Sequence, residues 1–240
     1  MSERPGDRAA AIYRALRQAI IEQALAPGAK LPEDAIGEKF GASRTIVRRA
    51  LSQLAADGLV DLRPNRGAAV ATPSWEEAHD TFEARLAMER LVVSRLVGNL
   101  TKDQVRKLNE HVVAEERTQG QSEPRSIRLA TEFHLLLAEM TGSPVLLRYV
   151  TELGLRCGLI LALYARPHSS DCAISEHREI IEALVAGDEA RAIAVMDQHL
   201  HAVTSRALIT QRSAKGRDIQ DILAMYAEPN VSKSGSKRRA

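Results

Sequence analysis

The spacing of turn-forming residues in the first third of this chain constrains its fold more than any other feature. Two helical patterns, over 33–40 and 44–56, are separated only by the tight turn Gly41-Ala42-Ser43. Two short β-type runs follow, 59–62 and 68–71, with proline, asparagine and glycine between them, as is typical of a hairpin. This order predicts two helices joined by a turn and followed by a two-stranded wing.

The residues around this motif extend it to a domain of residues 1–72. An apolar pattern that includes Ile12 and Leu16 predicts a preceding helix, and we expect that helix to stop at Ala26-Pro27-Gly28, because proline and glycine end helices. This domain holds 11 Lys and Arg against 8 Asp and Glu, whereas residues 73–230 hold 18 against 23. We call residues 1–72 the head and the helical region that follows it the body. A basic head on an acidic body favours a polyanion as the partner of the head.

The sequence beyond the head predicts an all-helical bundle. Glycine and proline divide residues 73–227 into about six helices of roughly 15 to 25 residues. Capping boxes at Ser74 and Thr101 place two helix starts near Trp75 and Lys102. Aromatic residues make up only 3% of the chain, which favours helices packed on helices over a sheet-rich fold. The predicted fold class is therefore mainly α, a winged helix-turn-helix followed by a helical bundle.

The ends of the chain and its hydropathy predict where the protein acts. Residues 228–240 have no apolar periodicity and are predicted to form a disordered basic tail. No uncharged run exceeds nine residues, whereas a helix needs about 20 apolar residues to cross a bilayer. The N-terminus also lacks the apolar segment of a signal peptide. We therefore expect a cytoplasmic protein without a membrane partner.

The second helix of the motif carries side chains that suit the reading of DNA. In a helix-turn-helix, the N-terminal residues of this helix reach base edges in the major groove, where an arginine can bind guanine O6 and N7 together. Three arginines on one helix are also typical of a solvated face, but a cation and a glycine at the wing tip favour a double-stranded DNA operator as the partner. The candidate DNA-binding residues are Ser43, Arg44, Thr45, Arg48, Arg49, Arg66 and Gly67.

Three histidines on three predicted helices of the body are candidates for one shared site. His134, His177 and His199 each lie on the apolar face of a helix, whereas His201 should point outward. A single histidine on an apolar face is usually a core residue, but three of them favour a shared imidazole site. Arg85 is a candidate partner for an effector carboxylate, and a salt bridge to a neighbouring glutamate is its other interpretation.

The head resembles the winged helix-turn-helix of GntR-type transcriptional regulators. Three positions depart from the usual pattern of that family: Asp34 stands where a basic residue is usual, Ile46 where proline is common, and Arg49 where glutamate is common. These departures imply an operator that differs from the usual family preference. The segments that carry the resemblance are Ala26-Pro27-Gly28-Ala29-Lys30-Leu31-Pro32-Glu33, Phe40-Gly41-Ala42-Ser43-Arg44-Thr45, Val47-Arg48, Ala50-Leu51, Asp57-Gly58-Leu59-Val60 and Arg66-Gly67.

The body resembles the FCD ligand-binding domain of the FadR-type branch of the same regulators. The matching segments are Phe82 to Glu89, Phe133-His134, Glu176-His177 and His199-Leu200. The resemblance implies a divalent metal such as Zn²⁺, held by three histidines and an aspartate. The histidines map onto His134, His177 and His199, but Ala130 stands at the aspartate position. Two alternatives stay open: three histidines hold the metal and leave a position for an effector carboxylate, or they bind the anion directly without metal.

Together these observations predict a ligand-responsive transcriptional regulator that binds operator DNA as a homodimer and responds to a small organic acid. One alternative is a constitutive DNA binder whose helical domain only dimerises. Another is a zinc enzyme that uses the three histidines. The sequence contains no HExxH, GxSxG or glycine-rich phosphate loop, which favours a protein that is not an enzyme.

Overall fold

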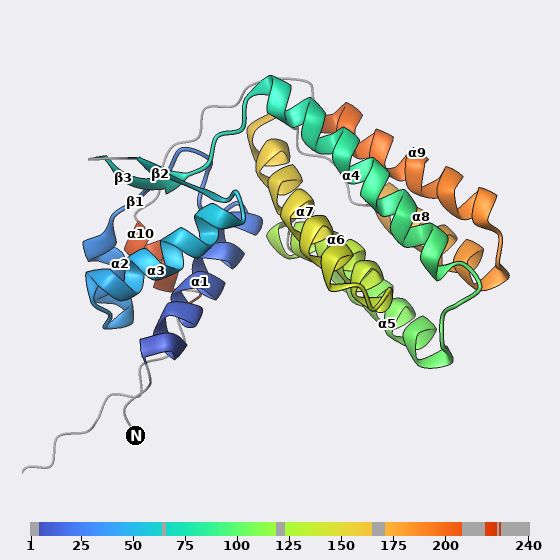
Figure 1. Cartoon of the computed structure of the whole chain (residues 1–240), viewed down its shortest axis with the longest axis horizontal. Coiled ribbons are helices and arrows are strands. Elements are labelled where there is room, and N and C mark those ends of the chain that lie inside the picture. Colours follow the sequence, from blue (N-terminus) through green and yellow to red (C-terminus); the bar gives the residue numbers. More distant parts are fainter. Residues whose placement is uncertain are drawn as a thin grey trace, which may run out of the picture.

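The computed structural model describes residues 5–63, 66–118, 123–164, 171–207, 219–224 and 226. Figure 1 shows a compact head of short elements beside a bundle of longer helices. The fold is mainly α with a small sheet, which confirms the predicted fold class. None of the helices in these ranges is long and apolar enough to span a membrane. The helices are α1 Pro5–Ile21, α2 Glu33–Phe40, α3 Arg44–Ala56, α4 Trp75–Leu96, α5 Lys102–Thr118, α6 Glu123–Met140, α7 Pro144–Tyr164, α8 Asp171–Ala186, α9 Glu189–Ala207 and α10 Ile219–Ala224.

Helices α2 and α3 have the predicted bounds. Gly41 ends α2 in the left-handed region with φ 58°, which glycine adopts without steric cost. The prediction for the end of the first helix is wrong, because α1 ends at Ile21 rather than near Pro27. Gln23 takes φ 56° there, and the Leu25 amide donates to the Ala19 carbonyl six residues back. The chain therefore closes α1 with a polar residue in the position that glycine usually takes.

The wing is part of a three-stranded antiparallel sheet in the order β1-β3-β2. Strands β2 (Val60–Arg63) and β3 (Gly67–Val70) form the predicted hairpin, each within one residue of its predicted bounds. Strand β1 (Lys30–Leu31) was not predicted, and it pairs Lys30 with Ala69 on the outer edge of β3. Two residues are too few to show the alternation from which a strand is predicted.

Six helices, α4 to α9, form the body in agreement with the prediction. The Ser74 hydroxyl accepts the Glu77 amide, and the Glu77 side chain accepts the Ser74 amide, so the predicted capping box is present. Thr101 and Gln104 make the same reciprocal pair at the start of α5. Apolar side chains of these helices form a main core that includes the fully buried Phe133, and a smaller cluster between α4 and α7 that includes Phe82 and Ile160. The predicted tail at 228–240 lies outside the described residues.

The head and the body share a packed contact along α7. Leu155 and Leu159 of α7 are buried in the core of the head. Gly58, which follows α3 with φ 73°, approaches Arg156 so closely that a Cβ at this position would lie 2.6 Å from Arg156 Nε. Helix α7 therefore connects the bundle directly to the end of α3.

The chain returns to the head after the bundle. Ile222 and Leu223 of α10 are buried in the same core as α1 and α3, and the Tyr226 hydroxyl donates to Glu22 at 2.6 Å. The sequence predicts this segment as part of the helical domain of residues 73–227, whereas its apolar contacts are with the DNA-binding domain. In Figure 1, α10 accordingly lies beside α1 and α2.

We expect Leu223→Ala to destabilise the head, although Leu223 is far from the head in the sequence. Removing a fully buried leucine side chain costs about 2 to 5 kcal/mol of unfolding free energy. Denaturant unfolding of the full chain measures this loss. Gln220→Ala, which removes an exposed hydrogen bond from α10 to Glu38, is the comparison and should cost less, about 0.5 to 1.5 kcal/mol. Equal stability of Leu223→Ala and the parent chain would show that α10 does not belong to the head core.

Candidate functional site

The two leading arginines of α3 are paired with acidic residues of α2. Arg44 donates from Nε to Asp34 Oδ1 at 2.6 Å and from Nη2 to Oδ2 at 2.9 Å. Arg48 donates from Nε to both carboxylate oxygens of Glu33 at 2.9 Å. Both arginines nevertheless leave 68% of their side-chain surface exposed. Two cations therefore lie one helical turn apart on the open face of α3, each with a defined orientation.

The other predicted DNA-binding residues lie on the same exposed part of the head. Thr45, Arg49 and Arg66 are exposed, and Gly67 has φ 77° at the tip of the hairpin. Ser43 occupies the N-cap position of α3, but among the described residues its side chain makes no capping hydrogen bond.

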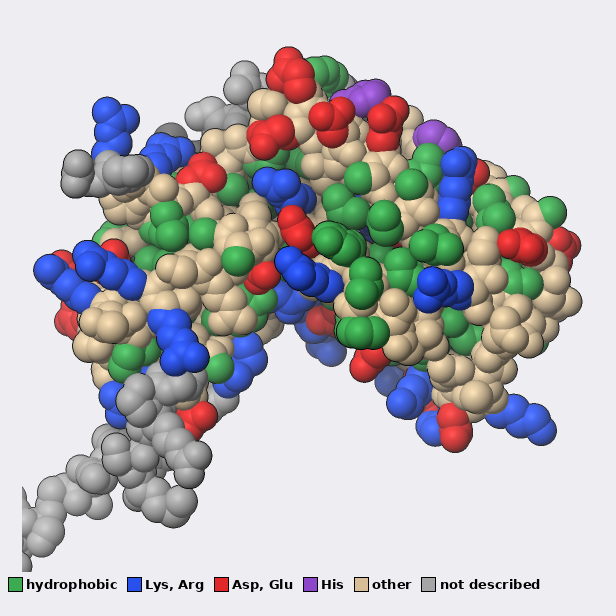
Figure 2. Space-filling view, in the orientation of Figure 1, with side chains coloured by type: hydrophobic (Ala, Val, Ile, Leu, Met, Phe, Trp, Pro, Cys, Tyr) green, Lys and Arg blue, Asp and Glu red, His purple; other side chains and the backbone are tan. Residues whose placement is uncertain are grey.

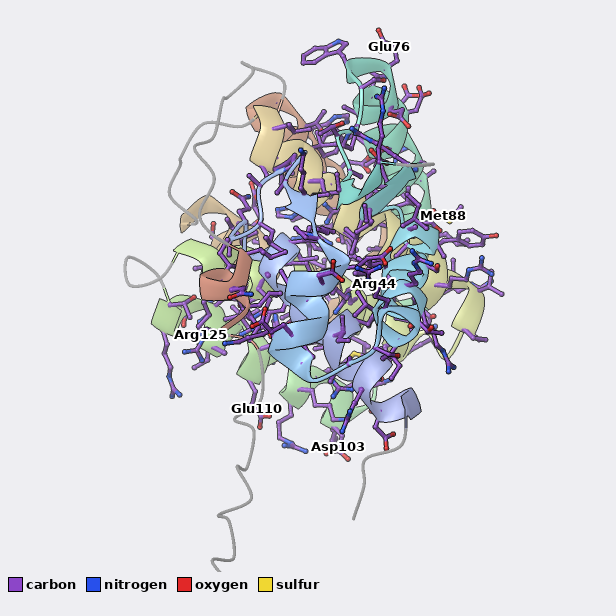
Figure 3. All side chains as sticks on the ribbon, turned by 90° about the vertical axis from the view of Figure 1, so that its left-hand side faces the viewer. Arg44, Glu76, Met88, Asp103, Glu110 and Arg125 are labelled. Carbon is purple, nitrogen blue, oxygen red and sulfur yellow. The ribbon has the colours of Figure 1, made fainter. Side chains whose placement is uncertain are left out.

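A groove of about 850 Å³ separates α3 from the wing. Five cationic and two acidic side chains line it, so the groove keeps a net positive charge that suits a phosphate backbone. Figure 2 shows Lys and Arg side chains gathered at the outer edge of the head. Figure 3, which views the molecule from the side of the head, shows Arg44 among the helices nearest the viewer. The charged residues of the groove are Lys30, Glu33, Asp34, Arg44, Arg48, Arg63 and Arg66.

The three predicted histidines meet in the interior of the body. His134 on α6, His177 on α8 and His199 on α9 are all buried, and one ligand atom from each lies within 4.8 Å of the others. The Nε2 atoms of His134 and His199 are 3.2 Å apart. The His177 ring stacks on Phe133 with centroids 3.9 Å apart, which fixes its plane. His201 is exposed, as its spacing predicted.

Each of these histidines has a glutamate on its Nδ1 atom. His134 Nδ1 pairs with Glu89 of α4, His177 Nδ1 with Glu115 of α5 at 2.9 Å, and His199 Nδ1 with Glu176 at 2.7 Å. A carboxylate on Nδ1 holds the proton there and leaves the Nε2 lone pair available. His177 Nε2 is buried and has no hydrogen-bond partner among the described residues. With a proton on each Nδ1, the three Nε2 atoms are acceptors, and the 3.2 Å approach of His134 and His199 Nε2 has no donor between them.

Arg85 of α4 lies within the same network and is itself buried. Its Nε donates to Glu89 Oε1 at 2.6 Å, so the salt bridge that was one of its two interpretations is present. Glu89 in turn pairs with His134, and the Cys157 thiol is a second hydrogen-bond partner of the guanidinium. Arg85 therefore orients Glu89, and through Glu89 it orients the imidazole of His134.

Burial and charge set the protonation of this network. Burial lowers the pKa of His134 to about 3, and it also lowers the pKa of His199. Burial opposes ionisation of Glu115, but hydrogen bonds from His111 and His177 outweigh it and bring the Glu115 pKa to about 2. Burial likewise opposes ionisation of Glu89, but His134 and Arg85 hold its pKa well below the usual range. At neutral pH the site therefore combines neutral His134 and His199 imidazoles with ionised Glu89 and Glu115 carboxylates.

Acidification is expected to destabilise the metal-free protein. In the unfolded chain His134 takes up a proton near pH 6.5, whereas in the folded chain it does so only near pH 3. The stability that comes from this difference is complete above pH 6.5 and is lost as the pH falls toward 3. Denaturant unfolding near pH 5 should thus give a free energy lower by roughly 2 kcal/mol than near pH 7.5. Equal values at both pH conditions would contradict buried neutral imidazoles.

The three supporting glutamates were not predicted as parts of the site. Glu89 and Glu115 stand on helix faces whose neighbours are buried valines and leucines, and a carboxylate among such residues is the signal that could have found them. Their partners are 45 and 62 residues away in the chain, so helical spacing alone does not reveal the pairs.

A winged helix-turn-helix with a basic groove, joined to a helical domain with a buried histidine cluster, defines a DNA-binding regulator with a ligand-binding domain. Comparison with known families supports this conclusion for both the head and the body. Residues 8–70 match the bacterial regulatory proteins of the gntR family, and residues 80–202 match the FCD domain. The chain belongs to the GntR family of transcriptional regulators, which are DNA-binding proteins whose FCD domain binds an effector. This is a family of regulators rather than of enzymes.

Curated relatives and solved structures support this assignment. The chain is 30% identical over 234 residues to the HTH-type transcriptional regulator LutR of Bacillus subtilis, covering 86% of this chain and 97% of LutR. It is 27% identical over 198 residues to the HTH-type transcriptional repressor RspR of Escherichia coli, covering 80% of this chain and 86% of RspR. The fold is similar to that of E. coli McbR/YncC, with a TM-score of 0.70, 23% identity, and coverage of 85% of this chain and 99% of that one.

Proposed function

We propose that this regulator binds its operator as a cytoplasmic homodimer and that a small organic acid changes its operator affinity from a metal site in the body. Ser43, Arg44, Thr45, Arg48 and Arg49 on α3 and Arg66 and Gly67 on the wing contact the DNA. His134, His177 and His199 hold a divalent metal such as Zn²⁺. The metal supplies an open coordination position for a carboxylate of the effector.

The convergence of three Nε2 lone pairs carries this proposal. Each Nδ1 faces a carboxylate, so each imidazole directs an acceptor toward the other two, and no donor among the described residues meets His177 Nε2. Facing lone pairs repel one another unless a cation lies between them. The residues present thus fit a divalent metal although Ala130 replaces the family aspartate.

The charge of the surrounding residues supports the same conclusion. Glu89, Glu115 and Glu176 bring three carboxylates next to the imidazoles. Arg85 pairs with Glu89, and His111 Nε2 lies 3.3 Å from Glu115 Oε1. A dication would balance the negative charge that these partners leave, which offsets the lost aspartate of the first coordination sphere. Direct binding of an anion by the histidines would need charged imidazoles, and burial lowers the pKa of both His134 and His199. The metal alternative is therefore the better supported of the two.

Arg85 keeps a place in the proposed effector site. The pair with Glu89 occupies its Nε–H group, whereas a guanidinium carries five donors. We propose that Arg85 positions Glu89 and that its remaining N–H groups contact the effector carboxylate.

Two contacts between the domains offer a route from the metal site to the DNA. Helix α6 carries both His134 and Arg128, and Arg128 Nε lies 3.2 Å from Glu22 Oε1 at the end of α1. Helix α7 packs on α6 and places Leu155 and Leu159 in the head core. A shift of α6 on effector binding would move α1 and the end of α3, and so change the spacing of the two reading heads.

The proposed dimer has a candidate contact face on α4 and α7. Leu91, Val145 and Tyr149 are large apolar residues with 43%, 60% and 44% of their surface exposed. Figure 2 shows apolar side chains gathered over these two helices. An exposed apolar patch of this kind is typical of a protein interface, and an operator with two half-sites needs two heads.

A thermal-shift screen of small carboxylates, with Zn²⁺ and with chelator, tests the effector site. A carboxylate present at about 100 times its Kd stabilises the folded protein by about 2.7 kcal/mol, which raises Tm by several degrees. We expect such a shift with metal and its loss with chelator. Shifts that survive chelator would favour direct anion binding, and the absence of any shift across the screen would favour the constitutive DNA binder.

A further inference from the structure

The acidic pair Glu33 and Asp34 stands where a DNA-binding surface is least expected to carry negative charge. Both residues lie in the first turn of α2 and line the same groove as Arg44 and Arg48. A carboxylate near a phosphate backbone repels it and lowers affinity for every DNA sequence. Their presence therefore calls for a compensating role.

Stabilisation of the fold accounts for little of that role. Carboxylates in the first turn of a helix interact favourably with its dipole, but solvent screens this effect at an exposed position. The Arg44 and Asp34 side chains are 68% and 72% exposed, and an ion pair this exposed contributes little to stability. The head core beneath is complete without them, with Val47, Leu51 and Leu54 buried. Substitutions at Asp34 are thus expected to leave the head folded.

The geometry of the pair limits how Arg44 approaches DNA. Asp34 occupies the Nε–H and one N–H of Nη2 in a side-on bidentate contact. Of the five donors of a guanidinium, this leaves the outer edge, formed by Nη1 and the second N–H of Nη2. That edge still presents two parallel donors, as guanine O6 and N7 require. The rest of the guanidinium is shielded from phosphate by the carboxylate.

We propose that Asp34 is a specificity-determining residue that holds Arg44 in the orientation for guanine and keeps it from the phosphate backbone. The proposal rests on the DNA-reading role of Arg44 proposed above. A side chain held in advance loses less conformational entropy on binding, and its fixed direction penalises the wrong base. Asp34 thereby lowers general affinity for DNA and raises discrimination at the base that Arg44 reads.

The neighbouring pair of Arg48 and Glu33 has a different geometry, which leaves more of the guanidinium free to bind phosphate. Within the described part of the chain, Arg48 donates to both oxygens of Glu33 from Nε alone, so the four N–H groups on its two terminal nitrogens have no partner there. Such an arginine can donate to phosphate from a broad range of directions. The two pairs therefore assign base reading to Arg44 and backbone contact to Arg48.

Binding measurements on Asp34 variants of the full chain test this inference. The operator is first selected from a random duplex library, and affinities are then measured on that operator, on single-base variants of it, and on random DNA of equal length. We expect Asp34→Ala to bind random DNA about 2 to 5 times more tightly and to lose about 10-fold of its discrimination at one base pair per half-site. Asp34→Glu keeps a carboxylate and should retain most of the discrimination. Glu38→Gln, which removes a charge from the same helix outside the groove, is the matched control with unchanged discrimination.

The double variant separates positioning from simple charge. In an Arg44→Ala background, Asp34→Ala should raise affinity for all sequences alike and leave discrimination unchanged. Equal gains of Asp34→Ala on operator and random DNA, with Arg44 still reading a base, would overturn the role of Asp34 alone. Equal losses of Arg44→Ala on operator and random DNA would instead overturn the proposed reading by Arg44.

Discussion

The His177→Ala variant is expected to lose its metal and its response to effector while it keeps operator binding in the absence of effector. His177 Nε2 is one of three proposed ligand atoms, and the site has no aspartate at position 130 to replace it. The fall in metal affinity should exceed the roughly 10- to 100-fold that follows from losing a carboxylate behind a histidine ligand. Metal content of the purified protein and competition with a chromogenic chelator measure this change.

Three further variants make this result interpretable. His177→Gln fills more of the space beside Phe133 and should lose metal equally, which separates ligand loss from a packing defect. His201→Ala removes an exposed histidine of α9 and should leave the metal bound. Ala130→Asp adds an anionic oxygen one helical turn before His134 and should tighten metal binding. Metal content that is equal in His177→Ala and the parent chain would remove the histidines from the metal site.

The second large effect is expected at the recognition helix. Arg44→Ala should weaken operator binding by about 1 to 3 kcal/mol, or about 5- to 150-fold, and remove the preference for one base pair in each half-site. Arg48→Ala should weaken binding to all sequences alike and reduce the salt dependence of binding by about one phosphate contact. Fluorescence anisotropy on operator and random duplexes over a range of salt concentrations measures both. Arg44 and Arg48 variants that behave identically on the two DNAs would contradict a division between base and backbone contacts.

The elements that the sequence predicted well are those defined by local signals. Helices α2 and α3 follow from the glycine turn and an apolar repeat, and the start of α4 follows from the capping box at Ser74. Strand β1 and the end of α1 were not predicted, because β1 is only two residues long and Gln23 takes a conformation that glycine usually marks. The end of α1 thus has the usual left-handed residue, but that residue is glutamine instead of glycine.

The sequence predicted the three histidines of the site but not the glutamates that support them. Apolar faces on three helices identify His134, His177 and His199 as inward-facing, and the structure brings them together. The glutamates on their Nδ1 atoms depend on which helices become neighbours, which is a property of the bundle. The contact of α10 with the head and the pairing of Asp34 with Arg44 are likewise tertiary. The sequence marks Asp34 as a departure from the family pattern and Arg44 as a DNA-binding candidate, but it does not show that the two form a pair.

The most direct test of the whole account is operator affinity of the metal-loaded protein with and without a carboxylate found in the thermal-shift screen. The account predicts a change of about 5- to 150-fold, the usual range of coupling between two sites, and its loss in His177→Ala and after chelation. Operator affinity that stays constant with saturating carboxylate, or that changes equally in His177→Ala, would contradict control of DNA binding from the three-histidine site.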